Sequence, residues 1–134
     1  MKQTDMLTTA SLLTILLMTF HMTGDILFRM APAGLVNLFV VFIFVVQLYG
    51  TLVLGGRRAG DIIIFLGSVL GLVIPVVHMK GTRLGGDIGN SGQAFFFVWT
   101  ILALGITATF SIILSARALW SLTWRRSRCA PTAV

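Results

Sequence analysis

Four long apolar segments dominate the 134-residue chain, and they limit what it can fold into more than any other feature. A helix needs about 20 mostly apolar residues to cross the hydrocarbon core of a bilayer. The runs are continuous rather than alternating, which favours membrane-spanning helices over the strands of a barrel. The predicted spans are residues 7–28, 35–54, 62–79 and 94–115.

The composition excludes most soluble classes of protein. Hydrophobic residues make up 57% of the chain and charged residues only 10%, against about 25% charged in an ordinary soluble domain. The 10 Lys and Arg residues outnumber the 4 Asp and Glu, but they are too scattered for a nucleic-acid surface. We therefore expect residues 1–134 to form a single transmembrane domain in contact with lipid and not with nucleic acid.

Short polar or glycine-containing breaks separate the apolar segments. Residues 31–34 and 55–58 form two brief breaks, and a longer glycine-rich loop covers residues 81–92. Helices joined by short connections pack as antiparallel neighbours. The sequence therefore predicts an all-α, up-down bundle of four membrane helices.

The distribution of Lys and Arg predicts the orientation, because cytoplasmic loops are enriched in both. With four spans the two termini share one side. That side carries seven basic residues: Lys2, Arg57, Arg58, Arg117, Arg125, Arg126 and Arg128. The other side carries three: Arg29, Lys80 and Arg83. We expect both termini in the cytoplasm, a basic tail over residues 116–134 touching anionic headgroups, and insertion in the inner (plasma) membrane of a bacterium.

Several small or special residues are predicted to mediate helix packing. Gly67 and Gly71 form a small-xxx-small pair that permits close backbone approach. Pro75 lacks the amide hydrogen that would bond the Gly71 carbonyl, so we expect it to bend its helix. A polar stripe along the fourth segment is also expected to pack against other helices: Thr100, Thr107, Ser111 and Ser115.

The few ionisable residues within or at the ends of the spans are candidate functional residues, because burying charge in lipid is costly. They are His21, Asp25, Arg29 and His78. His21 and Asp25 share one face of the first helix with Thr14 and Met18, so this face should point into the bundle. We expect a polar network near the outer side of the membrane.

A short pattern links the two histidines. His21 and His78 each begin an H-M-x-G sequence, and they are 57 residues apart. The same offset aligns the second span with the fourth. This suggests two hairpins repeated about an axis along the membrane normal, with the histidines at similar depth.

Three functions fit these residues. In the first, the chain is a small accessory or structural membrane subunit, in a homo-oligomer or a larger complex, and His21, Asp25, Arg29 and His78 fix helix register. In the second, His21 and His78 are the axial ligands of a b-type haem in an electron-transfer subunit. In the third, His21 and Asp25 titrate in a small proton-coupled transporter that acts as an oligomer. No paired nucleophile and base appears, so an enzyme acting alone is not expected.

Overall fold

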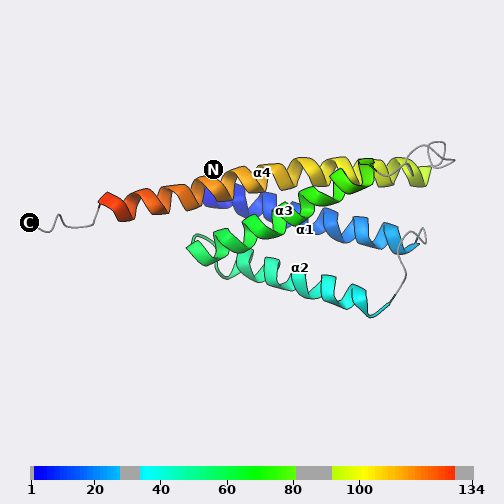
Figure 1. The fold of residues 1–134 in the computed structure, drawn as a ribbon, viewed down its shortest axis with the longest axis horizontal. Coiled ribbons are helices and arrows are strands. Elements are labelled where there is room, and N and C mark those ends of the chain that lie inside the picture. Colours follow the sequence, from blue (N-terminus) through cyan, green and yellow to red (C-terminus); the bar gives the residue numbers. More distant parts are fainter. Residues whose placement is uncertain (1, 28–33, 81–91, 129–134) are drawn as a thin grey trace, which may run out of the picture.

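The computed structural model of the chain is helical, and it describes residues 2–27, 34–80 and 92–128. Within these ranges there are four helices and no strand. Their bounds are Gln3–Leu27 (α1), Val36–Leu52 (α2), Arg58–Lys80 (α3) and Gly92–Arg128 (α4). Successive helices run in opposite directions (Figure 1), as the up-down arrangement predicts.

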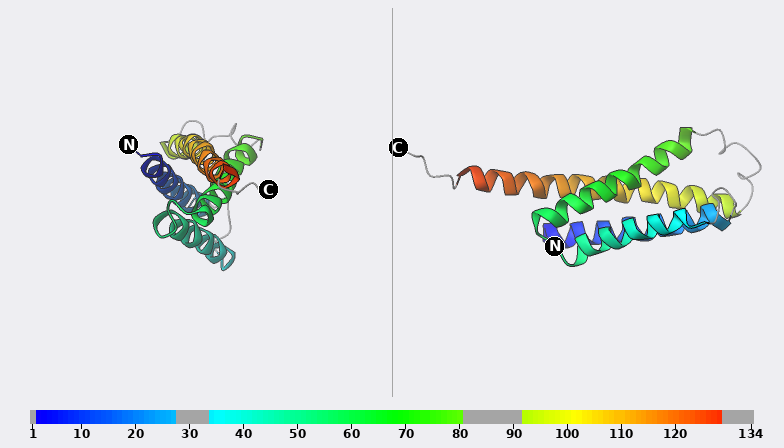
Figure 2. Two further views of the ribbon diagram at one scale, coloured as in Figure 1. Left: turned by 90° about the vertical axis from the view of Figure 1, so that its left-hand side faces the viewer. Right: turned by 60° about the horizontal axis from the view of Figure 1, so that its bottom comes forward.

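A tight turn joins α2 to α3 where the sequence predicts a break. The Arg57 N–H donates to the Leu54 carbonyl at 2.9 Å, and Gly56 has a φ of 76°, which favours glycine. This turn lies at the end of the bundle at which α1 begins and past which α4 extends (Figure 2). The other two predicted breaks fall largely on residues 28–33 and 81–91, which lie outside the described residues.

Three of the four helices are long and apolar enough to cross a membrane. These stretches are Gln3–Leu27, Arg58–Val77 and Phe95–Ser121, while α2 supplies a shorter apolar stretch, Leu38–Leu52. The fourth helix does not end near residue 115, the predicted end of its span, but continues to Arg128. The first part of the predicted basic tail, residues 116–128, is therefore helical. The apolar stretch includes its start, up to Ser121, and the C-terminal end of α4 extends past the bundle (Figure 1).

The helices form a flattened bundle in which α4 and α2 lie on opposite sides of the α1–α3 pair. Helix α4 packs most extensively against α3 and then α1, whereas α2 packs mainly against α3. The end-on view in Figure 2 shows this order. The α1–α2 contact is much smaller than the α3–α4 contact, so the two hairpins of the suggested repeat are packed unequally.

The two glycines of the predicted packing motif contact different neighbours. A Cβ atom on Gly71 would lie 3.3 Å from Thr14 Cγ2 of α1 and 3.5 Å from Ala108 Cβ of α4. A Cβ atom on Gly67 would lie 2.5 Å from Gln47 Cδ, so the Gln47 side chain of α2 rests directly on Gly67. Helix α3 continues through Pro75 to Lys80, and Pro75 packs against Gly105 of α4.

Many polar side chains are buried in this bundle, and many large apolar side chains are exposed. The fully buried side chains include many hydroxyl-bearing residues: Ser11, Thr14, Thr51, Ser68, Ser111 and Ser115. Large apolar side chains cover the outside, and Phe110, for example, is 58% exposed. The exposed large apolar side chains lie on all four helices, whereas soluble monomers rarely expose contiguous apolar patches larger than a few hundred Å².

Candidate functional site

The predicted polar face of α1 points into the bundle. Thr14, Met18, His21 and Asp25 are all buried, and His21 is only 1% exposed. Their spacing of four, three and four residues places them along one side of the helix, which packs against α4. The helical periodicity thus determines which of the polar residues of α1 lie inside.

His21 and Asp25 meet at the end of α1 that is remote from the N-terminus. Nε2 of His21 lies 3.4 Å from Oδ2 of Asp25, one helical turn further along. The imidazole ring also contacts Phe97 of α4, with the ring centroids 5.4 Å apart. A carboxylate beside an imidazole fixes the orientation and the tautomer of the ring. The pair is therefore a buried polar contact between two groups that can each exchange a proton.

The other two predicted members of the network are not placed by the structure. Arg29 lies outside the described residues. His78 belongs to α3, but the position of its side chain also lies outside what the structure describes. Of the two proposed haem ligands, only His21 is thus described, and its Nε2 atom faces Asp25. Among the described residues, no group of three or more His, Cys, Asp and Glu side chains could hold a metal ion.

Hydroxyl groups connect α1 to two of its neighbours. Ser11 Oγ lies 2.8 Å from Thr51 Oγ1 of α2, and Thr14 Oγ1 lies 3.4 Å from Ser111 Oγ of α4. Because the Thr51 hydroxyl already donates to the Gln47 carbonyl at 2.8 Å, it accepts from Ser11. These contacts join three helices in the half of the bundle nearer the N-terminus.

The predicted polar stripe of α4 is mostly buried, as expected for packing. Thr100, Ser111 and Ser115 are buried and Thr107 is half-buried. Thr100, Thr107 and Ser115 donate to carbonyl groups of their own helix, which satisfies their hydroxyls without another helix. Only Ser111 contacts a hydroxyl of another helix among the bonds seen in the described ranges.

Asp61 is a buried carboxylate that the sequence reasoning did not identify as a site residue. It is 2% exposed and lines a cavity of about 220 Å³ together with Gln3, Thr4 and Ser121. This cavity lies at the end of the bundle with the α2–α3 turn, opposite the end that holds Asp25. Asp25 and Asp61 therefore place one buried carboxylate near each end of the interior.

The spacing of Asp61 from other residues of α3 in the sequence is consistent with an inward-facing position on that helix. Asp61 stands three residues before Ile64, seven before Ser68 and ten before Gly71, and all four are buried. The apolar pattern starts the third span at residue 62, which leaves Asp61 in the preceding loop. Extending the helix by one turn would have put Asp61 on the same inward face.

Two further polar groups of the interior lack a hydrogen-bond partner within the described part of the chain. They are Nε2 of Gln47 and Oγ of Ser68. A buried polar group of this kind commonly bonds an ordered water or a ligand.

Comparisons of the chain with protein-family models, with curated proteins and with solved structures found no match.

Proposed function

We propose that the chain is an integral membrane protein whose four helices all cross the bilayer. The observation that carries this proposal is the distribution of side chains, with many hydroxyls, His21 and Asp25 inside and large apolar groups covering the outside. In water such an exterior would expose a large apolar area, whereas in lipid it is matched to its surroundings. Helices also satisfy their own backbone hydrogen bonds, as lipid requires.

The shortness of α2 is compatible with a span. Its 17 residues rise about 26 Å, a few Å less than the hydrocarbon core of about 30 Å. Leu35 and Val53 extend the apolar character at both ends. Local thinning of the bilayer around such a helix costs only fractions of a kcal/mol per Å.

The proposed topology places both termini in the cytoplasm of a cell with an inner (plasma) membrane. The structure supports it by bringing the start of α1, the α2–α3 turn and the distal part of α4 to one end of the bundle. That end carries the larger share of the Lys and Arg residues. The His21–Asp25 pair then lies near the non-cytoplasmic side.

Within the membrane, we propose that the chain acts as a small structural or accessory subunit. Its interior residues join helix to helix: Ser11 bonds Thr51, and the Gln47 side chain packs on Gly67. Such contacts set helix pairing and register. The large apolar exterior also leaves ample surface for assembly with a second copy or with other membrane proteins.

A fractionation experiment tests the membrane-spanning part of the proposal. Membranes from cells that make the full chain are washed with alkaline carbonate, which releases peripheral proteins. The protein should stay in the membrane pellet, as a known multi-pass protein in the same sample does. Its release into the supernatant would contradict a spanning bundle.

Proton-coupled transport by an oligomer is the second candidate function, and the placement of Asp61 favours it. Asp25 and Asp61 lie near opposite ends of an interior that also holds the Gln47 amide and several hydroxyls. Intramembrane carboxylates and histidines commonly act as proton relays.

Proton flux in liposomes distinguishes this candidate from a structural role. The purified protein is reconstituted with a pH-sensitive dye inside, and a membrane potential is applied. A proton pathway through the protein gives flux that Asp25→Asn and Asp61→Asn abolish, while Asp5→Asn, at an exposed position of α1, leaves it unchanged. Absence of flux in the wild-type protein contradicts a continuous proton pathway between the two carboxylates.

A further inference from the structure

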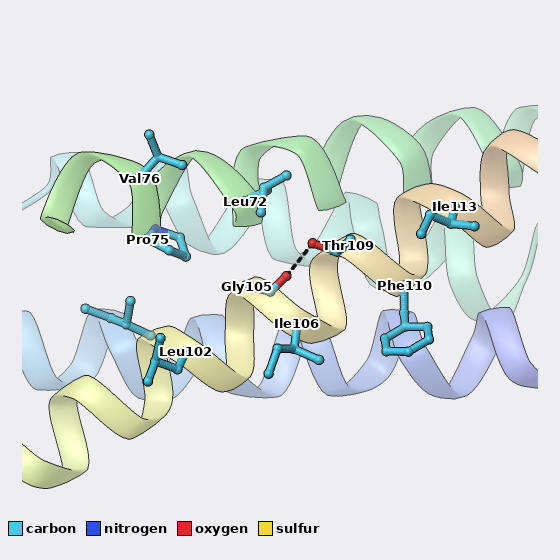
Figure 3. A pocket seen from close by; sticks show the side chains of 10 residues that line it. Leu72, Pro75, Val76, Leu102, Gly105, Ile106, Thr109, Phe110 and Ile113 are labelled. Atoms are coloured by element: carbon cyan, nitrogen blue, oxygen red, sulfur yellow. Dashed lines mark hydrogen bonds between the residues drawn. The ribbon is translucent and has the colours of Figure 1, made fainter. Parts of the chain in front are cut away.

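An apolar groove lies on the surface of the bundle between α3 and α4. It has a volume of about 450 Å³, and its walls include Leu72, Pro75 and Val76 of α3 and Ile106, Phe110 and Ile113 of α4 (Figure 3). Thr109 also lines it, but its hydroxyl donates to the Gly105 carbonyl at 2.7 Å. The groove therefore offers carbon surface and no group that requires a polar ligand.

The face of α4 that lines the groove also carries a positively charged residue, Arg117, nearer the C-terminal end of the helix. Arg117 and Trp120 follow Ile106 by 11 and 14 residues, so the three side chains share one side of the helix. Both Arg117 and Trp120 are exposed, Trp120 by 72%. The 11 residues from Ile106 to Arg117 rise about 17 Å, close to the thickness of one leaflet of the hydrocarbon core, about 15 Å.

We propose that this face is a binding site for an anionic phospholipid. One acyl chain lies in the α3–α4 groove, the phosphate bonds the Arg117 guanidinium, and the Trp120 indole lies at the level of the headgroup. This site rests on the proposed membrane-spanning function. The proposed site gives one lipid molecule a defined position. The sequence alone indicates only a general attraction of the basic tail to anionic headgroups.

Charge complementarity favours a lipid over a second copy of the chain. The chain has a net charge of +6 and 4 acidic residues, of which Asp25 and Asp61 are buried. A second copy therefore has little negative charge to place against Arg117. A phospholipid supplies in one molecule both the acyl chain for the groove and the negative charge for the arginine.

Native mass spectrometry of the full-length protein in mild detergent tests the site. Bound lipid is measured with phosphatidylglycerol and with phosphatidylcholine, which share acyl chains but differ in net charge. Wild-type protein should retain phosphatidylglycerol preferentially. Arg117→Gln should reduce this preference about fivefold, since one basic residue near a membrane surface contributes about 1 kcal/mol. Thr109→Phe, which fills the groove, should reduce retention of both lipids.

Matched controls use residues outside the proposed site. Arg57→Gln removes an exposed arginine at the same end of the bundle, and Leu66→Phe enlarges an exposed side chain of α3 away from the groove. Both should behave as wild type.

Three results would overturn the proposal. The first is equal retention of the two lipids by wild-type protein. The second is an equal loss of lipid preference in Arg57→Gln and Arg117→Gln. The third is a dimer in the spectra that Thr109→Phe abolishes, which would assign the groove to a second copy. All three differ from failure of the membrane-spanning proposal, which carbonate extraction tests separately.

Discussion

His21 Nε2 lies 3.4 Å from Asp25 Oδ2, one turn apart on α1, and both side chains are buried beneath α4. Polar groups of this kind are rare in apolar surroundings and are retained there for helix pairing or for chemistry. Because Phe97 of α4 contacts the same imidazole, the pair also anchors α1 to α4. Its energetic contribution can be measured directly.

A double-mutant cycle measures the coupling within this pair. His21→Phe keeps a ring against Phe97, and Asp25→Leu keeps a side chain of similar size. Each change should lower the free energy of unfolding by about 1–3 kcal/mol, because it removes a polar partner from a buried group. The coupling between them should be about 0.5–1.7 kcal/mol in detergent.

Thr19 and Thr23 provide the control for that cycle, since they are also one turn apart on α1 but exposed. Each hydroxyl donates to a backbone carbonyl of its own helix, so Thr19→Val and Thr23→Val should show no coupling. A coupling near zero for His21 and Asp25 would mean that the contact adds nothing to stability.

The Ser11–Thr51 bond should respond unequally to removal of its two ends. Ser11→Ala leaves the Thr51 hydroxyl bonded to the Gln47 carbonyl, so we expect a loss below about 1 kcal/mol. Thr51→Val removes both bonds and should be more destabilising. Thermal unfolding of the two variants measures this order, and the reverse order would contradict the assigned direction of the bond.

Gly67→Ala should displace the Gln47 side chain, because the new Cβ atom would lie 2.5 Å from Gln47 Cδ. The contacting atoms form the far end of a flexible side chain, so the loss of stability should lie near the lower end of the about 1–3 kcal/mol that overpacking costs. In a Gln47→Ala background the same substitution should cost less, because the shorter side chain leaves room for the methyl group. An equal cost of Gly67→Ala in the two backgrounds would show that the contact with Gln47 is not its cause.

The haem interpretation makes a spectroscopic prediction. Since Nε2 of His21 faces Asp25, we expect purified protein to show no Soret band, even after expression with added haem precursor. A Soret band that His21→Ala and His78→Ala both remove would reverse this expectation and establish the two histidines as axial ligands.

The helices and the inward face of α1 were predictable because they depend on local periodicity. Apolar runs of nearly 20 residues identify the helices, and the spacing of Thr14, Met18, His21 and Asp25 identifies a shared face. The turn at residues 55–58 was likewise marked by two glycines. None of these inferences requires knowledge of which helices are neighbours.

Features that depend on helix pairing or on exact helix ends were not predictable. Nothing in the sequence indicates that Gly67 contacts α2 while Gly71 contacts α1 and α4, because packing order is a tertiary property. Asp61 was not predicted because hydropathy starts a membrane span after the last charged residue. The helix itself begins several residues earlier, at Arg58. The continuation of α4 to Arg128 was missed for the same reason.

Labelling of single cysteines from one side of the membrane tests the central claim, a four-span protein with cytoplasmic termini. The chain's one cysteine, Cys129, lies beyond α4 in the sequence, and Thr82→Cys in a Cys129→Ser background marks the α3–α4 connection. In right-side-out vesicles, an impermeant maleimide should label Thr82→Cys at once and Cys129 only after the vesicles are opened. Labelling of Cys129 in sealed vesicles, or of both cysteines from the same side, would contradict this topology.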